Sequence, residues 1–209
     1  MRTRKEIGKD SPAILVVRFS SIGDVLLTTP VLRAIKARWP ASRVSFLTKD
    51  TFAPLLAGNP HVDEVVSVAP EASATEIKYA CLRLLNRRWR LLVDLHGSLR
   101  SRLVARLVKA EHKVRYSNLR LRRTLLIYAR LNFYEKNPPS VPERYAACLE
   151  DFGVELDDRP CELFLDDTDR EEASRLINEK WPDPVKYLAV APGAAWPVKR
   201  WPAERFTEA

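Results

Sequence analysis

The sequence predicts an α/β protein built on a doubly wound, Rossmann-like parallel sheet. Three observations lead to this prediction. Short apolar runs recur along the first half of the chain, helical spacing of apolar residues follows most of them, and short polar turns separate the two. Strands that are buried on both faces and joined by helical crossovers produce this pattern. The 209 residues, 46% hydrophobic and 30% charged, suffice for one domain and part of a second.

The first strand and helix lie near the amino terminus. Residues 14–17, Ile-Leu-Val-Val, follow Pro12 and predict a buried strand. The turn at 20–23, Ser-Ser-Ile-Gly, ends this strand, and Asp24 has the position of an N-cap or first-turn acid of a helix. Apolar residues at helical spacing continue to Trp39, with Pro30 marking a kink or a restart of the helix.

The alternation then continues through the rest of the first domain. The further strands are expected at 44–47, 65–68, 91–93 and 113–116, and the helices between them at 52–57, 76–88 and 99–108. Later elements are an Arg/Leu-rich helix near 119–133, a turn at 137–139, and helices at 142–152 and 170–180, with a polar bridge at 153–169.

A new strand at 187–190, a turn at 191–197 and a helix from Pro202 resemble the start of another α/β unit. We therefore expect a first domain over 1–160, and a linker with the beginning of a second domain over 161–209.

Charge is unevenly distributed along the chain. The formal net charge is +8, and residues 83–130 hold 14 Lys/Arg against two acidic side chains, whereas 143–183 hold 14 acidic side chains against five bases. A basic balance of this kind indicates an anionic partner, which could be nucleic acid, a phosphorylated metabolite or an anionic membrane.

Several classes of protein are disfavoured by what the sequence lacks. The six glycines form neither GxGxxG nor GxxxxGK[ST], so the usual dinucleotide-binding and P-loop signatures are missing. Cys81, Cys148 and Cys161 form no CxxC pair, which argues against a disulfide framework or a zinc site and fits a reducing cytoplasm. No apolar segment is long enough to cross a membrane, so any membrane contact is expected to be peripheral.

The turn that ends in Asp24 carries the clearest chemistry. It follows the first strand, and in open α/β sheets ligands bind at the carboxyl ends of the strands. Gly23 permits close approach of the backbone, and Asp24 holds a carboxylate over the crevice. Asp24 as a cap of its own helix is an equally good interpretation of the residues alone.

Three segments resemble one known family. They are VVRFSSIGDVLLTTPVLRAIKARWP at 16–40, LLVDLHGSLRSRLVARL at 91–107 and VAPGAAWPVKRWPAERF at 190–206. With these segments the chain closely resembles the glycosyltransferase family 9 enzymes, the ADP-heptose:lipopolysaccharide heptosyltransferases. The resemblance implies a GT-B architecture, with two Rossmann-like domains facing a cleft. The first, acceptor-binding domain is expected to be complete here, and the second, nucleotide-sugar-binding domain truncated.

The resemblance also implies roles for single residues. Asp24 becomes the general base of an inverting, metal-independent transfer that uses no cofactor, with a nucleotide-sugar such as ADP-heptose as donor. On the donor side the matching residues are Lys199, Gly193 and Ala194, and on the acceptor side they are Ser21, Gly23, His96, Gly97, Arg120, Arg122 and Arg123.

Plainer interpretations of these residues stay open. Lys199 could be a solvated loop lysine, and His96 a structural turn residue. Family members often carry Ser or Thr where this chain has Ala194 and Ala195, so backbone N–H groups would have to replace hydroxyl contacts to the diphosphate. His61 and His112 have no partner at ligand spacing and are expected at the surface.

The basic stretch at 83–130 has three interpretations. It could be a solvated helical face, a nucleic-acid-binding surface, or an electrostatic surface for a phosphorylated, Kdo-bearing lipid. No RNP, KH or helix-turn-helix pattern accompanies the charge, and the family resemblance favours the lipid for part of the stretch. No nucleic-acid partner is therefore expected.

The sequence thus predicts a glycosyltransferase that adds heptose from ADP-heptose to the inner core of lipopolysaccharide, in the Kdo–lipid A region. The expected location is the cytoplasm, in peripheral contact with anionic lipids of the inner leaflet. Two alternatives are a family 9 enzyme with another nucleotide-sugar donor, and a non-catalytic, truncated acceptor-binding remnant. The 209-residue chain alone is expected to be inactive.

Overall fold

The structure is a computed structural model that describes residues 5–7, 11–117, 127–131, 137–181, 186, 188, 190–191, 193–194 and 199–206. The chain divides into two compact units, 1–165 and 166–209. Each unit is described by itself below.

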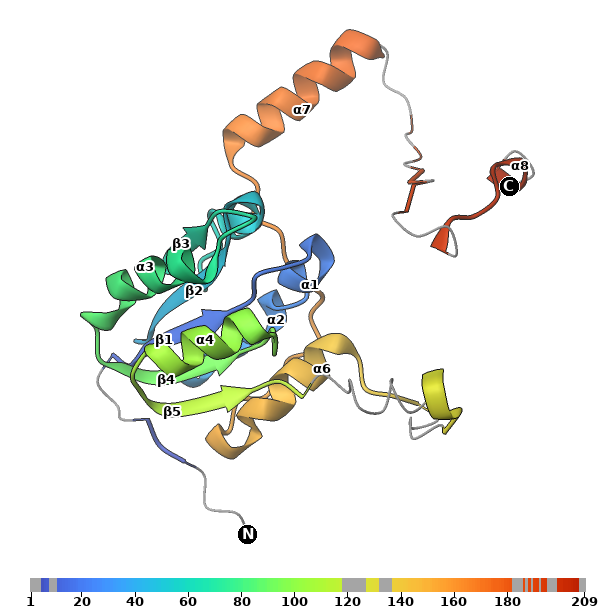
Figure 1. Cartoon of the computed structure of the whole chain (residues 1–209). Helices are drawn as coiled ribbons and strands as arrows, with labels where there is room; N and C mark the ends of the chain where they lie inside the picture. Colours follow the sequence, from blue (N-terminus) through green and yellow to red (C-terminus); the bar gives the residue numbers. More distant parts are fainter. Residues whose placement is uncertain are drawn as a thin grey trace. The chain divides into compact units, whose positions relative to one another are not determined.

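The first unit is built on a five-stranded sheet in which every pairing is parallel (Figure 1). In chain order the strands are β1 (Ala13–Val17), β2 (Arg43–Lys49), β3 (Glu64–Val68), β4 (Trp89–Asp94) and β5 (Ala110–Arg115). Their order across the sheet is β3-β2-β1-β4-β5. The chain adds strands to one side of β1 and then crosses to the other, so the loops after β1 and β4 flank the switch point where ligands bind in such sheets. The predicted doubly wound α/β fold is confirmed.

Helices cover both faces of this sheet. One face carries α3 (Ala74–Leu85) and α4 (Leu99–Leu107), and the other carries α2 (Thr29–Arg38), α6 (Val141–Ala146) and the 3₁₀ helix η2 (Ala147–Phe152). Alternate residues of β1 belong to opposite cores: Leu15 and Val17 pack with the α3–α4 core, and Ile14 and Val16 with the other. Burial on both faces explains why β1 is an unbroken apolar run.

The helix expected up to Trp39 is divided in two. The first part is α1 (Ile22–Leu26), and α2 follows from Thr29. The hydroxyls of Thr28 and Thr29 donate to the carbonyls of Val25 and Leu26 at 2.6 and 2.9 Å, which satisfies the end of α1. Pro30 lies in the first turn of α2, where its missing N–H removes no helical hydrogen bond. Pro30 therefore marks a restart of the helix, one of the two predicted alternatives.

Two other expected helices differ in type. The segment expected as a helix at 52–57 is a 3₁₀ helix, η1 (Asp50–Leu56), which contains Pro54. The helix expected at 142–152 is α6 followed by η2, and Gly153, with φ of +69°, ends it. A 3₁₀ geometry is common in short connecting pieces and last turns of helices. β5 begins three residues before the expected position 113.

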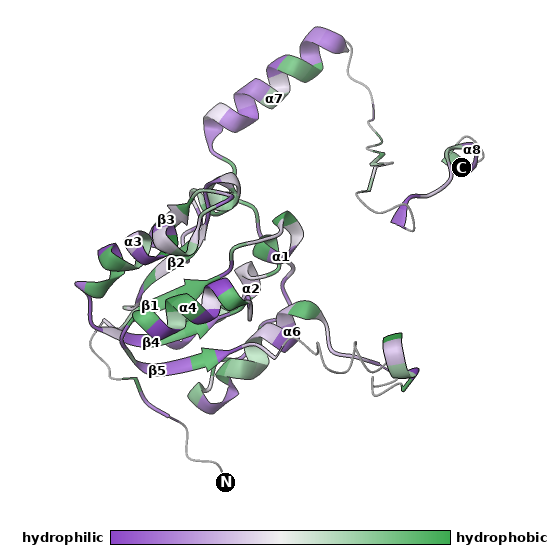
Figure 2. Cartoon of the chain, viewed as in Figure 1, coloured by the Kyte–Doolittle hydropathy of each residue, from purple (hydrophilic) through white to green (hydrophobic). Residues whose placement is uncertain are grey.

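The second unit contains α7 (Asp167–Lys180) and α8 (Ala203–Phe206). The Asp166 side chain caps α7 by accepting from the Asp169 N–H at 2.7 Å, and the helix is hydrophilic over most of its length and has no buried residue (Figure 2). Of the strand expected at 187–190, only residues 188 and 190 are described, and neither is in a strand. The helix expected near 119–133 lies mostly outside the described residues, although 127–129 are helical.

Two general expectations from the sequence concern membranes and thiols. No helix among the described residues combines the length and apolar character needed to cross a membrane. All three cysteines are free thiols, and burial raises the pKa of Cys81 to about 11 and that of Cys148 to about 12.

Candidate functional site

Asp24 lies in the first turn of α1, directly after the polar turn that follows β1. Its Oδ2 accepts hydrogen bonds from the Ser21 backbone N–H at 3.3 Å and from the Ser21 hydroxyl at 3.1 Å. This is half of a capping box, so Asp24 does cap its own helix. The Asp24 side chain is nevertheless 38% exposed, so it is also accessible to a ligand.

Arg18 connects this turn to the neighbouring loop. Its Nη2 lies 2.6 Å from Asp24 Oδ2, its Nε donates to the Ser20 carbonyl at 2.7 Å, and its Nη1 donates to the Leu95 carbonyl at 2.6 Å. The side chain is only 10% exposed. A buried guanidinium that bonds through all three of its nitrogens holds the loops after β1 and β4 in a fixed relation at the switch point.

Tyr145 reaches the same carboxylate from α6. Its hydroxyl lies 3.5 Å from Asp24 Oδ1, and the Arg18 guanidinium lies 5.5 Å from the centroid of its ring. The residue is 1% exposed, and burial raises the pKa of the phenol to about 12. The phenol is therefore protonated and donates toward Asp24.

The charge state of Asp24 follows from these neighbours. Partial burial raises the pKa of the carboxyl, but the Arg18 charge and the hydrogen bonds from Ser21 and Arg18 outweigh it, and the pKa lies below its ordinary value. Asp24 is thus a carboxylate at neutral pH. Oδ2 takes all the close donors, whereas Tyr145 is the only donor toward Oδ1 among the described residues.

A second carboxylate, Asp94, builds the loop after β4. It is 1% exposed; its Oδ1 accepts from the backbone N–H groups of His96 at 3.0 Å and Gly97 at 2.9 Å. Its Oδ2 accepts from the Ser101 hydroxyl at 3.1 Å and from Arg115 Nε at 2.8 Å. Four donors balance the cost of burying this charge. Gly97 has φ of +65°, a conformation that side chains disfavour.

Five of the predicted site residues therefore lie on two loops joined by Arg18: Asp24, Ser21, Gly23, His96 and Gly97. A Cβ added to Gly23 would meet nothing within 4 Å, so this position borders open space. The ring of His96 packs edge-on against Phe19, with centroids 5.8 Å apart.

The remaining predicted residues lie elsewhere. Lys199, Gly193 and Ala194 belong to the second unit, where Arg200 Nε donates to the Ala194 carbonyl at 2.6 Å and Lys199 is exposed. Arg120, Arg122 and Arg123 lie outside the described residues.

Sequence reasoning missed Arg18, Asp94 and Tyr145. Arg18 and Asp94 did stand inside the quoted segments, at the ends of the first and fourth strands, and a charged residue there was the available signal. The expectation that His61 and His112 lie at the surface holds only in part. Both are half-buried, with rings against Phe164 and Phe152.

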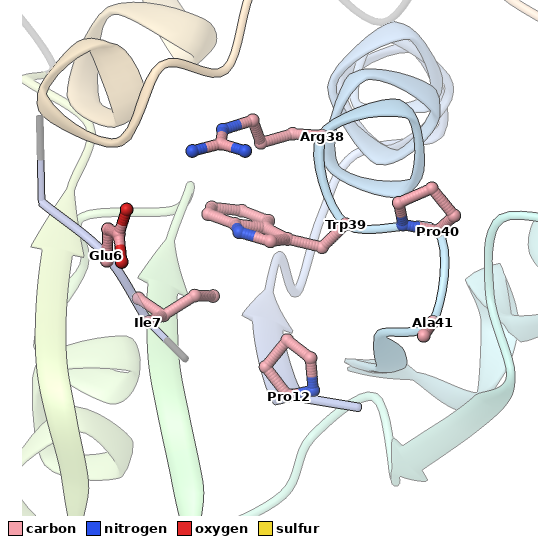
Figure 3. A pocket seen from close by; sticks show the side chains of 7 residues that line it. All are labelled: Glu6, Ile7, Pro12, Arg38, Trp39, Pro40 and Ala41. Carbon is pink, nitrogen blue, oxygen red and sulfur yellow. The ribbon is translucent and has the colours of Figure 1, made fainter. Parts of the chain in front are cut away.

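A separate hollow lies at the end of the sheet opposite to Asp24. Figure 3 shows Arg38 beside the Trp39 ring, with Pro12, which precedes β1, also lining the hollow. It opens at the amino edge of the strands, away from Asp24. In the described part of the chain, no cluster of three or more His, Cys, Asp or Glu side chains could hold a metal ion.

Comparison with known proteins identifies the family. A sequence model described as "Glycosyltransferase family 9 (heptosyltransferase)" matches residues 80–209, more than half of the chain. The chain belongs to glycosyltransferase family 9. This confirms the resemblance seen in the sequence.

Individual members of family 9 are more distant. Lipopolysaccharide heptosyltransferase 2 of Salmonella typhimurium is 27% identical over 205 residues, which cover 93% of this chain and 58% of that protein. A family 9 structure from Veillonella parvula has a TM-score of 0.76 at 20% identity, covering 95% of this chain and 59% of that one. The structure of E. coli heptosyltransferase WaaC with ADP-2-deoxy-2-fluoro heptose has a TM-score of 0.60 at 22% identity, with 94% and 64% covered. The chain thus spans about 60% of the length of these relatives.

Proposed function

We propose that this protein acts in an inverting, metal-independent transfer of heptose from ADP-heptose to the inner core of lipopolysaccharide. The first unit would bind the acceptor and the second the nucleotide-sugar. Membership of family 9 supports this proposal, as does the similarity to lipopolysaccharide heptosyltransferase 2 of Salmonella typhimurium. The observation that carries it is the ionised carboxylate of Asp24, half-exposed at the switch point of the sheet and oriented by Arg18.

The geometry divides the work between the two oxygens of Asp24. Oδ2 is held by Arg18 and Ser21, while Oδ1 has only the longer contact to Tyr145 among the described residues. We assign Oδ1 as the atom that takes the proton from the acceptor hydroxyl. The hydroxyl oxygen then bonds to the anomeric carbon of the donor as the bond from that carbon to the ADP oxygen breaks, and ADP leaves with the electron pair. Attack opposite the leaving group inverts the anomeric centre.

The other predicted residues have supporting roles in this proposal. On the acceptor side, Ser21 and Gly23 border the open space beside Asp24, and the loop with His96 and Gly97 forms the neighbouring wall. Arg120, Arg122 and Arg123 would attract acceptor phosphates.

On the donor side, Lys199 would offset the charge that develops on the diphosphate, and backbone groups of Gly193 and Ala194 would donate to it. Because the proposed transfer uses no metal ion, these groups would stabilise the leaving diphosphate. The basic stretch at 83–130 would hold the protein against anionic lipids of the inner leaflet, on the cytoplasmic side.

The decisive test is Asp24→Asn, assayed for sugar transfer from ADP-heptose. General-base catalysis is worth roughly 10²–10⁴-fold, so sugar transfer measured by mass spectrometry should fall by about 10³-fold. The matched control is Glu76→Gln on α3. Glu76 makes the same capping-box contact with Ser73 that Asp24 makes with Ser21, but it lies away from the site. If Asp24→Asn keeps activity within a few-fold of Glu76→Gln, Asp24 is a cap and not the base.

A further inference from the structure

A hollow of about 350 Å³ lies on the α3–α4 face of the sheet, between α4 and β5. Arg102 and Arg106 border it from the helix, and Lys113 and Arg115 from the strand. The other residues that line it are Leu92, Asp94, Ala105 and Val114. Four cations and one carboxylate therefore surround the space.

The strand side of this hollow departs from the usual pattern of a covered sheet. In register, Lys113 neighbours Leu92 and Arg115 neighbours Asp94, and Leu92 belongs to the apolar core under α3 and α4. A strand face next to a covering helix is normally apolar. β5 instead presents a lysine and an arginine there, while Val114 packs into the core on the opposite face.

The cations on the strand are already held in place. Lys113 Nζ donates to the Ala105 carbonyl at 2.6 Å, which ties β5 to α4 across the hollow, and Arg115 Nε donates to Asp94 Oδ2 at 2.8 Å. The ammonium keeps two further N–H donors, and the guanidinium keeps its Nη groups. Asp94 offers little repulsion to an anion, because four donors engage its carboxylate.

The cations on the helix are differently situated. Arg102 and Arg106 are four residues apart and so share one face of α4. Both are exposed, and no acidic side chain among the described residues pairs with either. Both arginines line the hollow, and within the described residues neither charge is neutralised by an acidic side chain.

We propose that this hollow binds a phosphomonoester. Such a group carries a charge of about −1.5 to −2 at neutral pH and three acceptor oxygens. An arginine guanidinium can donate to two phosphate oxygens at once, and the lysine ammonium adds a further positive charge. The site takes either the headgroup of a lipid or a soluble sugar phosphate, because both present the same group. Its residues make no contact with Asp24, so it goes beyond the proposed transfer and does not depend on it.

The first experiment titrates the 209-residue chain with glycerol 3-phosphate by NMR. We expect a dissociation constant in the millimolar range, shifts centred on α4 and β5, and at least ~10-fold weaker binding for Arg102→Gln/Arg106→Gln. The control, Arg88→Gln/Arg100→Gln, removes the same charge from exposed residues that do not line the hollow, Arg100 being on the same helix. Control binding should stay within about two-fold of wild type, and all melting temperatures should agree because the four side chains are exposed.

A second experiment distinguishes the two sources of the phosphate. Flotation compares phosphatidylcholine vesicles that contain phosphatidate with vesicles that contain phosphatidylserine at equal surface charge. A preference for phosphatidate that the Arg102/Arg106 variant loses assigns the site to a lipid headgroup. Glycerol 3-phosphate binding without that preference assigns it to a soluble phosphate. The proposal is overturned if both double variants weaken binding equally, or if the wild type neither binds glycerol 3-phosphate nor prefers phosphatidate.

Discussion

A substitution at Gly23 can distinguish an effect on stability from an effect on substrate binding. An added methyl group would contact nothing within 4 Å, and the residue lies inside α1, where alanine is favoured over glycine by roughly 0.5–1 kcal/mol. We expect Gly23→Ala to keep or slightly raise the melting temperature. If the acceptor approaches this backbone, the same methyl group will raise KM in a transfer assay.

Gly97→Ala is the matched contrast, because Gly97 has φ of +65° and should lose about 1 kcal/mol or more of stability through backbone strain. An unchanged KM for Gly23→Ala would mean that no substrate approaches the turn at this point.

Sequence reasoning at this scale placed Asp24 and Gly23 in the turn and helix start that follow the first strand, where the structure has them, and their roles stay predictions. It missed the residues that hold them. Arg18 bonds to Leu95, 77 positions away, and Tyr145 reaches Asp24 from 121 positions away. Composition and local spacing carry no information on such contacts, which exist only once the sheet order brings β1, β4 and α6 together.

At the scale of elements, α2 anchors the segment that leads out of the first unit. Arg33 is 3% exposed; its Nε donates to Asp157 Oδ2 at 2.8 Å and its Nη1 lies 2.6 Å from Glu162 Oε2. Thr29, one turn earlier, accepts from the Glu162 N–H at 3.0 Å. Residues 157–162 are thereby fixed to α2, the second helix after the turn that precedes Asp24.

Arg33→Ala should therefore lower the stability of the first unit. Breaking a fully buried ion pair costs ~3–5 kcal/mol; because the Asp157 and Glu162 side chains are 41% and 24% exposed and can rehydrate, we expect about 2 kcal/mol. Urea unfolding measures the change. Arg90→Ala, which breaks the exposed pair with Glu111, should stay within about 0.5 kcal/mol of wild type. Equal effects of the two substitutions would show that the Arg33 contacts do not stabilise the fold.

The edge strand β3 should make stability depend on pH. Glu64 accepts from the Arg87 guanidinium and from the Ser45 hydroxyl at 2.8 Å. The Arg87 hydrogen bond is the main cause that lowers the pKa of Glu64 below its ordinary value of 4.5, although partial burial opposes it. Because the pKa is lower in the folded state, this contribution is present above about pH 4.5 and is lost as the pH falls through the folded value.

Glu64→Gln should thus melt below wild type at pH 7, and the difference should shrink as the pH is lowered from 5 to 3. Thermal melts across this range provide the measurement. A difference that is constant with pH would mean that Glu64 acts through packing and not through its charge.

The approximate positions of the strands and their parallel pairing could be predicted at this scale, because apolar runs buried on both faces are distinctive. The breaks between helices were harder to predict from the sequence. The hydroxyls of Thr28 and Thr29 end α1 by donating to backbone carbonyls three residues earlier. The helical spacing of apolar residues continues across this break, so the pattern does not reveal it. The cationic face of β5 could not be predicted either. Residues 83–130 were interpreted as one charged stretch, and the sequence does not distinguish the residues that line a hollow from those that face water.

At the scale of the whole molecule, the basic stretch at 83–130 predicts salt-sensitive binding to anionic vesicles. Exposed charges are screened over about 8 Å at physiological ionic strength, so binding should fall steeply as salt rises. Flotation with phosphatidylserine vesicles at low and high salt tests this, with neutral phosphatidylcholine vesicles as the control. Binding that does not change with salt, or no binding at low salt, would contradict a peripheral electrostatic association.

The chain divides into two compact units. That the second begins another α/β domain, as the turn and helix start near the carboxyl terminus suggest, stays a prediction. Family membership over residues 80–209 agrees with the segments at 91–107 and 190–206.

The way Asp94 builds its loop bears on how such enzymes could diverge. The carboxylate accepts hydrogen bonds from the backbone N–H groups of residues 96 and 97. Any amino acid except proline would supply the N–H group at position 96. The loop can therefore keep its path while the side chain at position 96 is exchanged. If His96 contacts the acceptor as proposed, exchange of that one side chain would change which acceptor binds, whereas Asp94 and Gly97 would have to stay.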